Sequence, residues 1–348
     1  MESLAQVEQL IEEVRSEHAP DPRLAVFEVE YCFEGDAFML RGETSEAAAA
    51  EALHRGVALL SGWAEVLDLI VRLPMHDGTE PTHAVVISAL VPLLAVPMVS
   101  AGHVSQCVLG HRLTVLRRRG KWLHCRAEDG YLGWVHRGYV AEVDERSARA
   151  WEIGTDGEAC ISLGAEVHSE DGEVLARLPR GARVVQQHDG VIRLPDGATG
   201  RLVGEILPLA ERAERFAPRG EAVVRTAALW LGAPYVWGGV TPAGVDCSGL
   251  AQAVLGLHGV KLPRDSDQQA QVGETVEPDR DFSNVRPGDL LFFAETPERV
   301  THVVLSEGGS RIIHASLGNG GVRRNDVLGP LPYEQELRDL FVCVRRYF

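Results

Sequence analysis

The chain has 348 residues, of which 45% are apolar, and its 50 acidic against 34 basic residues give a formal net charge of -16. This length predicts two to four domains, and the negative charge disfavours a phosphate backbone or an anionic membrane surface, so nucleic acid is not an expected partner. There is no apolar run of about 18 residues, so no membrane insertion is expected, and six scattered cysteines without a CxxC pair fit neither a zinc site nor a disulfide scaffold.

The first seventeen residues are predicted to form an amphipathic helix, because Leu4, Val7, Leu10, Ile11 and Val14 recur at helical spacing. This start is acidic and has neither the basic lead nor the apolar stretch of a secretory signal. We therefore expect a cytoplasmic protein, with a periplasmic or extracellular location as the alternative if residues are missing upstream.

Residues 1–78 are predicted to be a small α+β module. Apolar and polar residues alternate over 25–33 as in a half-buried strand, "TSEAAAAEALHRGVALLSGWA" favours a helix with Thr44 as a possible N-cap, and "VLDLIVRL" favours a closing strand. Nothing in the module indicates chemistry, so packing or docking is the expected role.

Between residues 82 and 208 the pattern changes to short apolar runs separated by Gly, Asp and Arg turns, which is typical of small β-barrels. Two segments, "LGHRLTVLRRRGKWLHCRAEDGYLGWVHRGYV" and "LPRGARVVQQHDGVIRLPDGATGRLVGEIL", share the order of their turns and valine strands. They resemble the SH3-like barrels attached to bacterial cell-wall enzymes, which predicts one barrel over 82–143 and a second over 146–208.

The last domain is expected over 220–348, after the polar connection "ERAERFAPRG". A helix is predicted over 221–232, and strands over "RPGDLLFFAE", "THVVLSEG", "RIIHASL" and "LFVCVRRYF". Helices followed by a strand meander indicate an α+β domain.

Cys247 lies in "GGVTPAGVDCSGLAQAVLGLHG", directly before a predicted helix whose apolar face carries Leu250, Val254 and Leu257. A thiol at the positive end of a helix dipole is expected to have a pKa below its usual value of about 8.5, which favours the nucleophilic thiolate. Cysteines are more often structural, but the polar neighbours Asp246 and Ser248 favour a nucleophile here.

A thiol nucleophile needs a base, and His302 and His314 are the candidates. If "EGG" at 307–309 is a three-residue hairpin loop, Ser306 faces Ser310 and His302 stands directly opposite His314 on one face of the sheet. Pressed against the helix that carries Cys247, that face would supply a base and a second imidazole that orients it.

Here the domain resembles the NlpC-type (NlpC/p60) cell-wall cysteine peptidases. The matching motifs, in the order of that family, are "YVWGG", "DCSGL", "LPRDS", "RPGDLLFF", "THVVL" and "IIHAS". The resemblance implies a papain-like α+β fold with Cys247 as nucleophile, His302 as general base and His314 as the orienting third residue, and it implies that no metal or organic cofactor is needed.

Relatives that join two SH3-like domains to this domain resemble γ-D-glutamyl-L-diamino-acid endopeptidases, which cut peptidoglycan stem peptides after D-glutamate. The implied partners are therefore peptidoglycan-derived stem peptides with a free N-terminal L-alanine, as in murein peptide recycling. The residues that match the family's substrate pocket are Tyr131 from the first barrel and Tyr235, Trp237, Asp246, Ser248, Arg264 and Ser266 from the last domain.

Two of these residues have alternative roles. Asp246 suits a substrate ammonium or an N-cap of the helix that follows, and it can do both. Arg264 suits the α-carboxylate of D-glutamate, or it braces its loop through an ion pair.

The sequence departs from the family at the first barrel, where the segment "VSAGHVSQCVLG" lacks the glutamate that relatives place on the substrate amine. Strict dependence on a free amine is therefore in doubt. Two other functions stay open: an N-acetylmuramoyl-L-alanine amidase or another amide acyl transferase that uses the same three residues, and a non-catalytic cell-wall-binding protein.

Overall fold

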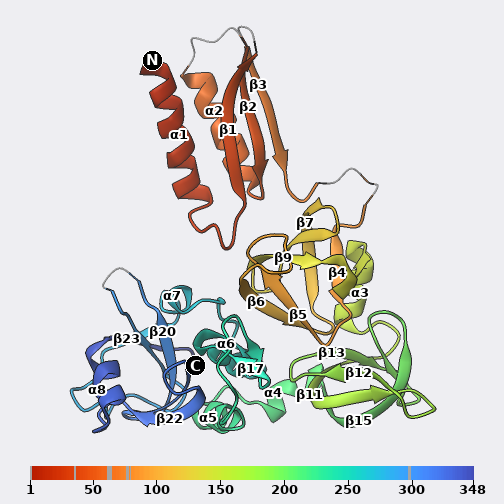
Figure 1. Ribbon diagram of the computed structural model, residues 1–348, viewed down its shortest axis with the longest axis vertical. Coiled ribbons are helices and arrows are strands. Elements are labelled where there is room, and N and C mark those ends of the chain that lie inside the picture. The colour runs from red at the N-terminus through yellow and green to blue at the C-terminus, as the bar shows by residue number, and fades with distance from the viewer. Residues whose placement is uncertain (1, 35–36, 61–64, 76–77, 79, 297–298) are drawn as a thin grey trace.

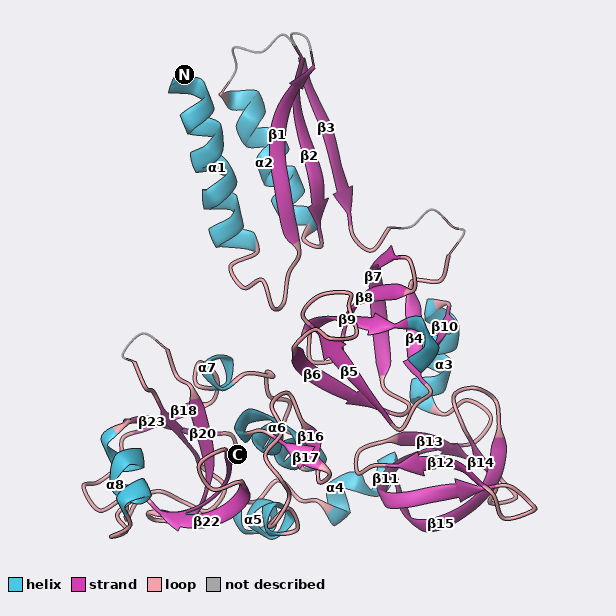
Figure 2. Ribbon diagram, viewed as in Figure 1, coloured by secondary structure: helices cyan, strands magenta, loops and turns pink. Residues whose placement is uncertain are grey.

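The structure is a computed structural model that describes residues 2–34, 37–60, 65–75, 78, 80–296 and 299–348. It is a multidomain α+β protein in which an N-terminal module, two β-barrel regions and a C-terminal α+β domain follow one another along the chain (Figures 1 and 2). Among the described residues, no helix is long and apolar enough to cross a membrane.

The N-terminal module is a three-stranded sheet with two helices on one face (Figure 1). Strands β1 and β2 are antiparallel, whereas β2 and β3 are parallel because α2 returns the chain between them. Val7 of α1, Phe38 of β2 and Leu53 of α2 are fully buried between the layers. Its elements are α1 (Glu2–His18), β1 (Phe27–Glu34), β2 (Ala37–Thr44), α2 (Ala47–Leu59) and β3 (Glu65–Arg72).

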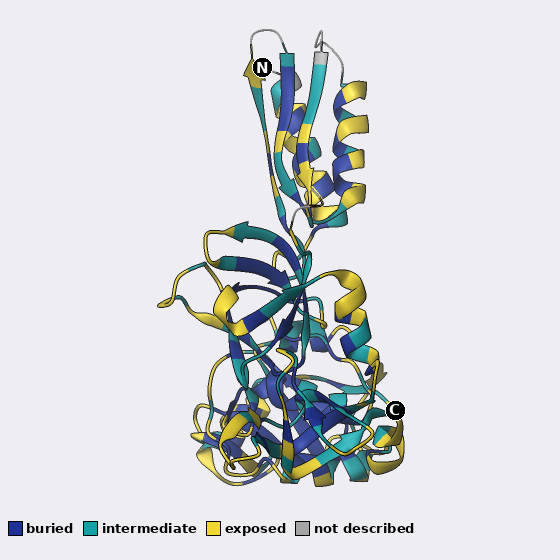
Figure 3. Cartoon of the chain, turned by 90° about the vertical axis from the view of Figure 1, so that its right-hand side faces the viewer, coloured by how far each residue is buried: buried dark blue, intermediate teal, exposed yellow. Residues whose placement is uncertain are grey.

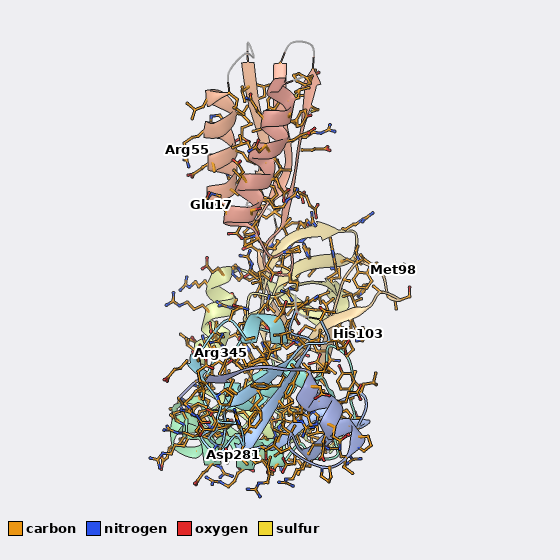
Figure 4. All side chains as sticks on the ribbon, turned by 90° about the vertical axis from the view of Figure 1, so that its left-hand side faces the viewer. Glu17, Arg55, Met98, His103, Asp281 and Arg345 are labelled. Carbon is orange, nitrogen blue, oxygen red and sulfur yellow. The ribbon has the colours of Figure 1, made fainter. Side chains whose placement is uncertain are left out.

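The outer sides of the two helices face solvent in Figure 3, and Figure 4 shows Glu17 and Arg55 projecting from them. The N-cap of α2 is Glu46, so the prediction of Thr44 as N-cap is wrong. Thr44 ends β2 instead, where its hydroxyl donates to the Val26 carbonyl and accepts from the Glu46 N–H.

The first barrel is a seven-stranded sheet in the order β10-β4-β7-β8-β9-β5-β6. Its apolar core includes Leu93, Leu113 and Val135, which are fully buried. Its strands are β4 (His83–Val86), β5 (Leu90–Leu94), β6 (His103–Val108), β7 (Arg112–Arg119), β8 (Trp122–Arg126), β9 (Leu132–His136) and β10 (Val140–Val143), with a 3-10 turn at Arg137–Tyr139.

A helix, α3 (Glu145–Ile153), occupies the place where the second barrel was expected to begin. Asp144 caps it by accepting from the Ser147 N–H, and Gly154 ends it with a left-handed φ of 72°. The first residues assigned to the second barrel therefore form a helix, and the strands of that barrel begin with β11.

The second barrel is a five-stranded sheet that pairing between β11 and β15 closes on itself. Its strands are β11 (Glu158–His168), β12 (Val174–Leu178), β13 (Arg183–Gln186), β14 (Ile192–Arg193) and β15 (Thr199–Pro208). Short turns, a 3-10 turn (Leu209–Glu211) and α4 (Arg212–Arg215), lead from it to the last domain.

The C-terminal domain packs helix α6 against a six-stranded sheet in the order β18-β23-β19-β20-β21-β22. The predicted helix over 221–232 ends earlier than expected, at Ala228, and the sequence reading missed β22 and α8. The elements are α5 (Gly220–Ala228), β16 (Val240–Thr241), β17 (Gly244–Val245), α6 (Cys247–Leu257), α7 (Ser266–Gln269), β18 (Glu274–Val276), β19 (Leu290–Phe293), β20 (His302–Gly308), β21 (Arg311–Ser316), β22 (Gly321–Asp326), α8 (Pro332–Asp339) and β23 (Phe341–Arg346).

The N-terminal module is fixed to the first barrel by apolar and ionic contacts. Val26 and Leu73 pack with Leu116 and Leu132 of the barrel, and Arg117 lies within 2.7 Å of both Glu28 and Glu43. In Figure 1, the loop between α1 and β1 points toward the first barrel and α7. This docking brings residues 19–26 close to the C-terminal domain.

Candidate active site

Cys247 is the first residue of α6, and Asp246 is the N-cap of that helix. The Asp246 carboxylate accepts from the Gly249 N–H at 2.7 Å, which satisfies one of the free N–H groups of the first turn. The predicted helix start and the N-cap role of Asp246 are both confirmed.

The expected lowering of the cysteine pKa is wrong. Burial, with the neighbouring Asp246 charge, raises the pKa of Cys247 to about 11, although hydrogen bonds from the Val303 and Ser248 N–H groups act in the other direction. The thiol is only 8% exposed, so loss of hydration outweighs the helix dipole. The free protein at neutral pH therefore holds a thiol.

Asp246 and Arg264 form a buried ion pair. Arg264 donates from Nη2 to Asp246 Oδ2 at 2.7 Å and from Nη1 to Asp246 Oδ1 at 3.1 Å, and the Gly238 N–H donates to Oδ2 at 2.8 Å. Ser248 accepts a further bond from Arg264 Nη1 at 2.9 Å. The Asp246 carboxylate thus has several donors already, and Arg264 braces the start of α6.

The same arginine joins the last domain to the first barrel. Arg264 Nε donates to Ser105 Oγ on β6 at 2.9 Å, and the Val240 N–H donates to Gln106 Oε1 at 3.3 Å. Gly238 lies so close to β6 that an added Cβ would meet the His103 Cβ at 3.4 Å. Figure 4 shows His103 on the first barrel, above the C-terminal domain. The segment in which an acid was expected therefore contributes uncharged Ser105 and Gln106.

The predicted direct pairing of His302 with His314 is wrong. Strands β20 and β21 pair Ser306 with Ile312, a register two residues away from the expected one, because the chain turns within 308–311, where two glycines have φ of 108° and 65°. A shift of two residues keeps side chains on the same face. The two imidazoles therefore still meet, diagonally, with His302 Nε2 at 2.8 Å from His314 Nδ1.

The two histidines do not face the body of α6 as predicted. Residues that alternate with them, among them Val303 and Ile313, pack with Leu250 and Val254 of the helix. The contact with the nucleophile comes at the helix end instead, where the Val303 N–H, one residue after His302, hydrogen-bonds to the Cys247 sulfur.

Beyond His314, two asparagines and a glutamate continue the hydrogen-bond chain. His314 Nε2 lies 3.1 Å from Asn325 Oδ1, and Asn325 Nδ2 donates to Glu334 Oε1 at 3.2 Å. Asn319 Nδ2 lies 3.2 Å from His314 Nε2 and makes its shorter contact, 2.8 Å, with Asn325 Oδ1. Sequence analysis missed these residues, because β22 and α8 were not expected and an isolated asparagine carries no motif.

This chain of hydrogen bonds selects one tautomer for the His302 ring and one for the His314 ring. Asn325 Oδ1 can only accept, so His314 Nε2 carries the proton and its Nδ1 is a bare acceptor. His302 Nε2 must then donate to that Nδ1, which leaves His302 Nδ1 unprotonated. A bare ring nitrogen is what a general base requires.

Both rings are neutral at physiological pH. Burial lowers the pKa of His302 to about 3, assisted by His314, and lowers the pKa of His314 to about 4 against the hydrogen bond to Asn325. The Tyr333 ring lies against His314, with centroids 6.0 Å apart and planes 30° apart. The Cys247 thiol and both imidazoles are therefore neutral in the free protein.

The other predicted pocket residues lie in segments that hydrogen-bond to residues 245–248, at the start of α6. Tyr235 is half-buried and forms a β-bridge with Val245, two residues before the nucleophile, and burial raises its pKa. Trp237 is 68% exposed, and Ser266 begins α7. All three lie in loops or at an element end, where side chains can meet a ligand.

Tyr131 reaches the C-terminal domain through a residue that sequence analysis passed over. Its hydroxyl donates to Asp265 Oδ2 at 2.9 Å, and Asp265 stands between Arg264 and Ser266. Arg23 of the N-terminal module contacts the same Asp265 oxygen at 2.8 Å. The position of Asp265 within "LPRDS" was the available signal, whereas no sequence pattern connects Arg23 to the site.

Comparison with known proteins agrees with this geometry. Residues 232–340 match the NlpC/P60 family, and residues 93–138 match the bacterial dipeptidyl-peptidase Sh3 domain. The chain is 27% identical to a gamma-D-glutamyl-L-lysine dipeptidyl-peptidase of Bacillus cereus over 61% of its own length and 66% of that enzyme. It is 28% identical to dipeptidyl-peptidase 6 of Lysinibacillus sphaericus over 76% of its length and 100% of that enzyme.

A solved structure of an NlpC/P60 family protein from Bacillus cereus shares the fold, with a TM-score of 0.64 at 20% identity over 76% of this chain and 99% of that one. The N-terminal module lies ahead of both family matches. Residues 232–340 are thus an NlpC/P60 cysteine peptidase domain, and a bacterial dipeptidyl-peptidase Sh3 domain lies ahead of them in the chain.

Proposed function

We propose that this protein hydrolyses peptidoglycan-derived stem peptides at the bond between the γ-carbonyl of D-glutamate and the diamino acid that follows. The proposal rests on the thiol of Cys247 at the start of α6, which the backbone of Val303, the residue after His302, approaches. It rests also on the histidine pair, whose tautomers leave His302 Nδ1 free to accept a proton. The printed names of the relatives, gamma-D-glutamyl-L-lysine dipeptidyl-peptidases, support the substrate class.

In this mechanism Cys247 is the nucleophile, His302 the general base and His314 the residue that orients it. As the sulfur attacks the carbonyl carbon, His302 Nδ1 takes the thiol proton, and His314 Nδ1 accepts from the imidazolium that forms. The Cys247 N–H at the N-terminal end of α6 is the proposed donor to the oxyanion, since the helix dipole stabilises negative charge there.

The second half of the reaction returns the protein to its starting state. The His302 imidazolium donates its proton to the leaving amine, and a thioester to Cys247 remains. His302 then deprotonates a water molecule, which attacks the thioester and releases the dipeptide acid and the thiol. No step needs a further reactant.

Substrate contacts are proposed for Tyr131, Tyr235, Trp237 and Ser266. In contrast, Asp246, Ser248 and Arg264 hydrogen-bond to one another, which favours a supporting role for these three. Their network holds the start of α6 and the Arg264 loop in place.

We also propose that the second barrel, β11–β15, is SH3-like, since its strands carry the internal repeat and its sheet closes on itself. A papain-like arrangement is proposed for the last domain, because its nucleophile begins a helix and its base begins a strand.

The test is mass spectrometry of the purified protein with L-Ala-γ-D-Glu-L-Lys and with its diaminopimelate counterpart. We expect L-Ala-D-Glu and the free diamino acid from the unaltered protein and from Cys343→Ala, a matched control at another cysteine of the same domain, but not from Cys247→Ala. Release of N-acetylmuramic acid from N-acetylmuramoyl peptides in place of this cut would identify an amidase. No product from either substrate class would contradict both.

A further inference from the structure

We propose that the outer edge of β3 pairs with the same strand of a second copy of this chain, so that two N-terminal modules share one continuous sheet. The inference concerns a part of the chain that neither family match reaches, and it does not depend on the proposed hydrolysis. Among the described residues, β3 has a neighbouring strand on one side only, because it ends the order β1-β2-β3. The backbone groups along its other side are a template for a further strand.

Two hydrogen bonds show which backbone groups of β3 point outward. The Leu73 N–H, directly after the strand, donates to the Thr44 carbonyl of β2 at 2.8 Å, so the odd-numbered residues face β2. The Ile70 N–H donates instead to Asp68 Oδ1, a side-chain atom, at 3.0 Å. Since successive residues of a strand direct their backbone groups to opposite sides, the even-numbered residues face outward. In the middle of β3 these are Asp68, Ile70 and Arg72.

The side chains along this edge are apolar on the face of the sheet that the helices leave open. Leu69 is 53% exposed and Val71 is 36% exposed, whereas Ile70, which alternates with them, is buried under the helices. Natural edge strands often prevent pairing with a proline or a lysine, and β3 contains neither. An apolar edge strand of eight residues without these residues favours pairing with another strand.

Charge selects one antiparallel register for β3 and its copy. When Ile70 lies opposite the second copy's Ile70, Asp68 lies opposite the second copy's Arg72, and Arg72 opposite the second copy's Asp68. All of these residues face outward, so the strands can exchange backbone hydrogen bonds at each pair. Between these pairs, Leu69 lies opposite the second copy's Val71, at the closely spaced positions without hydrogen bonds. The strand is therefore complementary to itself, as a two-fold dimer requires.

The neighbouring registers lack this complementarity. A shift of two residues in one direction pairs Asp68 with Ile70, and a shift in the other direction pairs Asp68 with Pro74, which has no N–H to donate. Within one chain, Arg72 Nη2 already lies 3.1 Å from Asp68 Oδ2, and the Arg72 side chain is 49% exposed. Pairing exchanges this contact for the same contact between two chains.

The position of the module leaves room for a second copy. In Figure 1, the module projects from one end of the molecule, and β3 lies along its outer side, away from the C-terminal domain. Antiparallel pairing places the two first barrels at opposite ends of the joined sheet. The rest of one chain therefore need not contact the rest of the other.

The experiment measures the mass of the full chain by sedimentation over a series of protein concentrations. We expect the mass to rise with concentration from that of one chain, 37.9 kDa, toward twice that value. Asp68→Arg or Arg72→Asp places like charges opposite one another twice in the dimer. Each change alone is therefore expected to raise the dissociation constant by at least about tenfold.

A mixture of these two variants is the decisive sample. In a dimer of one Asp68→Arg chain with one Arg72→Asp chain, opposite charges again lie opposite one another at both positions. We expect the mixture to associate at concentrations where neither variant does so alone. Both variants lose the contact between these residues within one chain, and mixing cannot restore it, so recovery shows contact between chains.

Leu69→Glu tests the apolar part of the interface, and Leu175→Glu is its matched control. Leu175 is also an exposed leucine, 42% exposed, and its strand β12 also ends the strand order of its sheet. We expect Leu69→Glu to raise the dissociation constant by at least about tenfold and Leu175→Glu to leave it unchanged. Circular dichroism establishes that each variant is folded.

Three results would overturn the inference. A parent that keeps the mass of one chain at every concentration would identify Asp68 as a charge that keeps the edge unpaired. A dimer that Leu69→Glu leaves intact, or that Leu175→Glu disrupts, would place the contact elsewhere. A mixture that associates no more than its components would limit Asp68 and Arg72 to their contact within one chain. None of these residues belongs to the proposed catalytic site, so hydrolysis by the same variants tests the proposed function separately.

Discussion

Asn325 offers the sharpest test of the tautomer argument, because it contacts neither the nucleophile nor its base. Replacing it by leucine removes the acceptor at 3.1 Å from His314 Nε2. The buried Nε2–H then lacks its partner, and an orphaned buried donor costs about 1–3 kcal/mol. Moving the proton to His314 Nδ1 avoids this cost, but His302 must then carry its own proton on Nδ1, where it cannot act as base.

The expected loss of activity follows from that free energy. Since each 1.36 kcal/mol corresponds to a factor of ten in rate, Asn325→Leu is expected to lower kcat by about 5- to 160-fold. KM is expected to stay within about twofold, because Asn325 is a positioning residue and not a substrate contact in this mechanism.

Asn325→Asp keeps an acceptor oxygen at this position and removes the amide donor. The new carboxylate still accepts from His314, but it meets the Glu334 oxygen that the Asn325 amide now contacts at 3.2 Å. Two carboxylates at that distance repel, so the double variant Asn325→Asp with Glu334→Gln is expected to regain activity that Asn325→Leu cannot. Asn319→Ala removes only a neighbouring donor and serves as the mild control.

The assay is steady-state hydrolysis of L-Ala-γ-D-Glu-L-Lys at several pH values, with circular dichroism to establish that each variant is folded. The carboxylate variants are expected to raise the pKa of His314 and therefore to move the acid limb of the pH–activity profile to higher pH. A folded Asn325→Leu variant that keeps kcat within twofold would refute the role of the Asn325 acceptor.

Three further predictions concern stability. Because burial lowers the pKa of His302 to about 3 and of His314 to about 4, the native state binds fewer protons than the unfolded state. The free energy of unfolding should therefore fall as pH drops below about 6.5, by about 1–2 kcal/mol per histidine at pH 5. Urea titrations at pH 7 and pH 5 measure this difference. Equal free energies of unfolding at the two pH values would contradict the burial of neutral histidine rings. Asp246→Ala leaves Arg264 buried without its counter-ion and should lower the free energy of unfolding by about 3–5 kcal/mol. Replacing Asp246 by leucine and Arg264 by methionine together should recover most of that loss. A double variant that is no more stable than Asp246→Ala in chemical denaturation would reject this account. Gly249→Ala places a Cβ 2.1 Å from the Gly239 carbonyl oxygen and should cost about 1–3 kcal/mol, while Gly256→Ala, with open space on the same helix, should stabilise by up to about 1 kcal/mol. Equal melting temperatures for these two variants would count against the close approach of α6 to Gly239.

Local signals in the sequence determined much of the C-terminal domain. The start of α6 at Cys247 follows from the Asp246 cap and the apolar periodicity, and the same-face placement of His302 and His314 follows from strand alternation. These features depend on residues within one or two elements, so pattern reasoning reaches them. The order of the family motifs extended the reading to the family itself.

The tertiary structure decided what depends on distant segments. The glycine turn within 308–311 set the register of β20 and β21, and burial reversed the expected pKa shift of Cys247. Asn325 and Arg23 join the site only because β22 lies beside β21 and because the N-terminal module docks on the first barrel. No local pattern encodes the loss of hydration at a buried side chain. Nor does one encode a contact between residues 242 positions apart, such as Arg23 and Asp265. Both are properties of the folded chain as a whole.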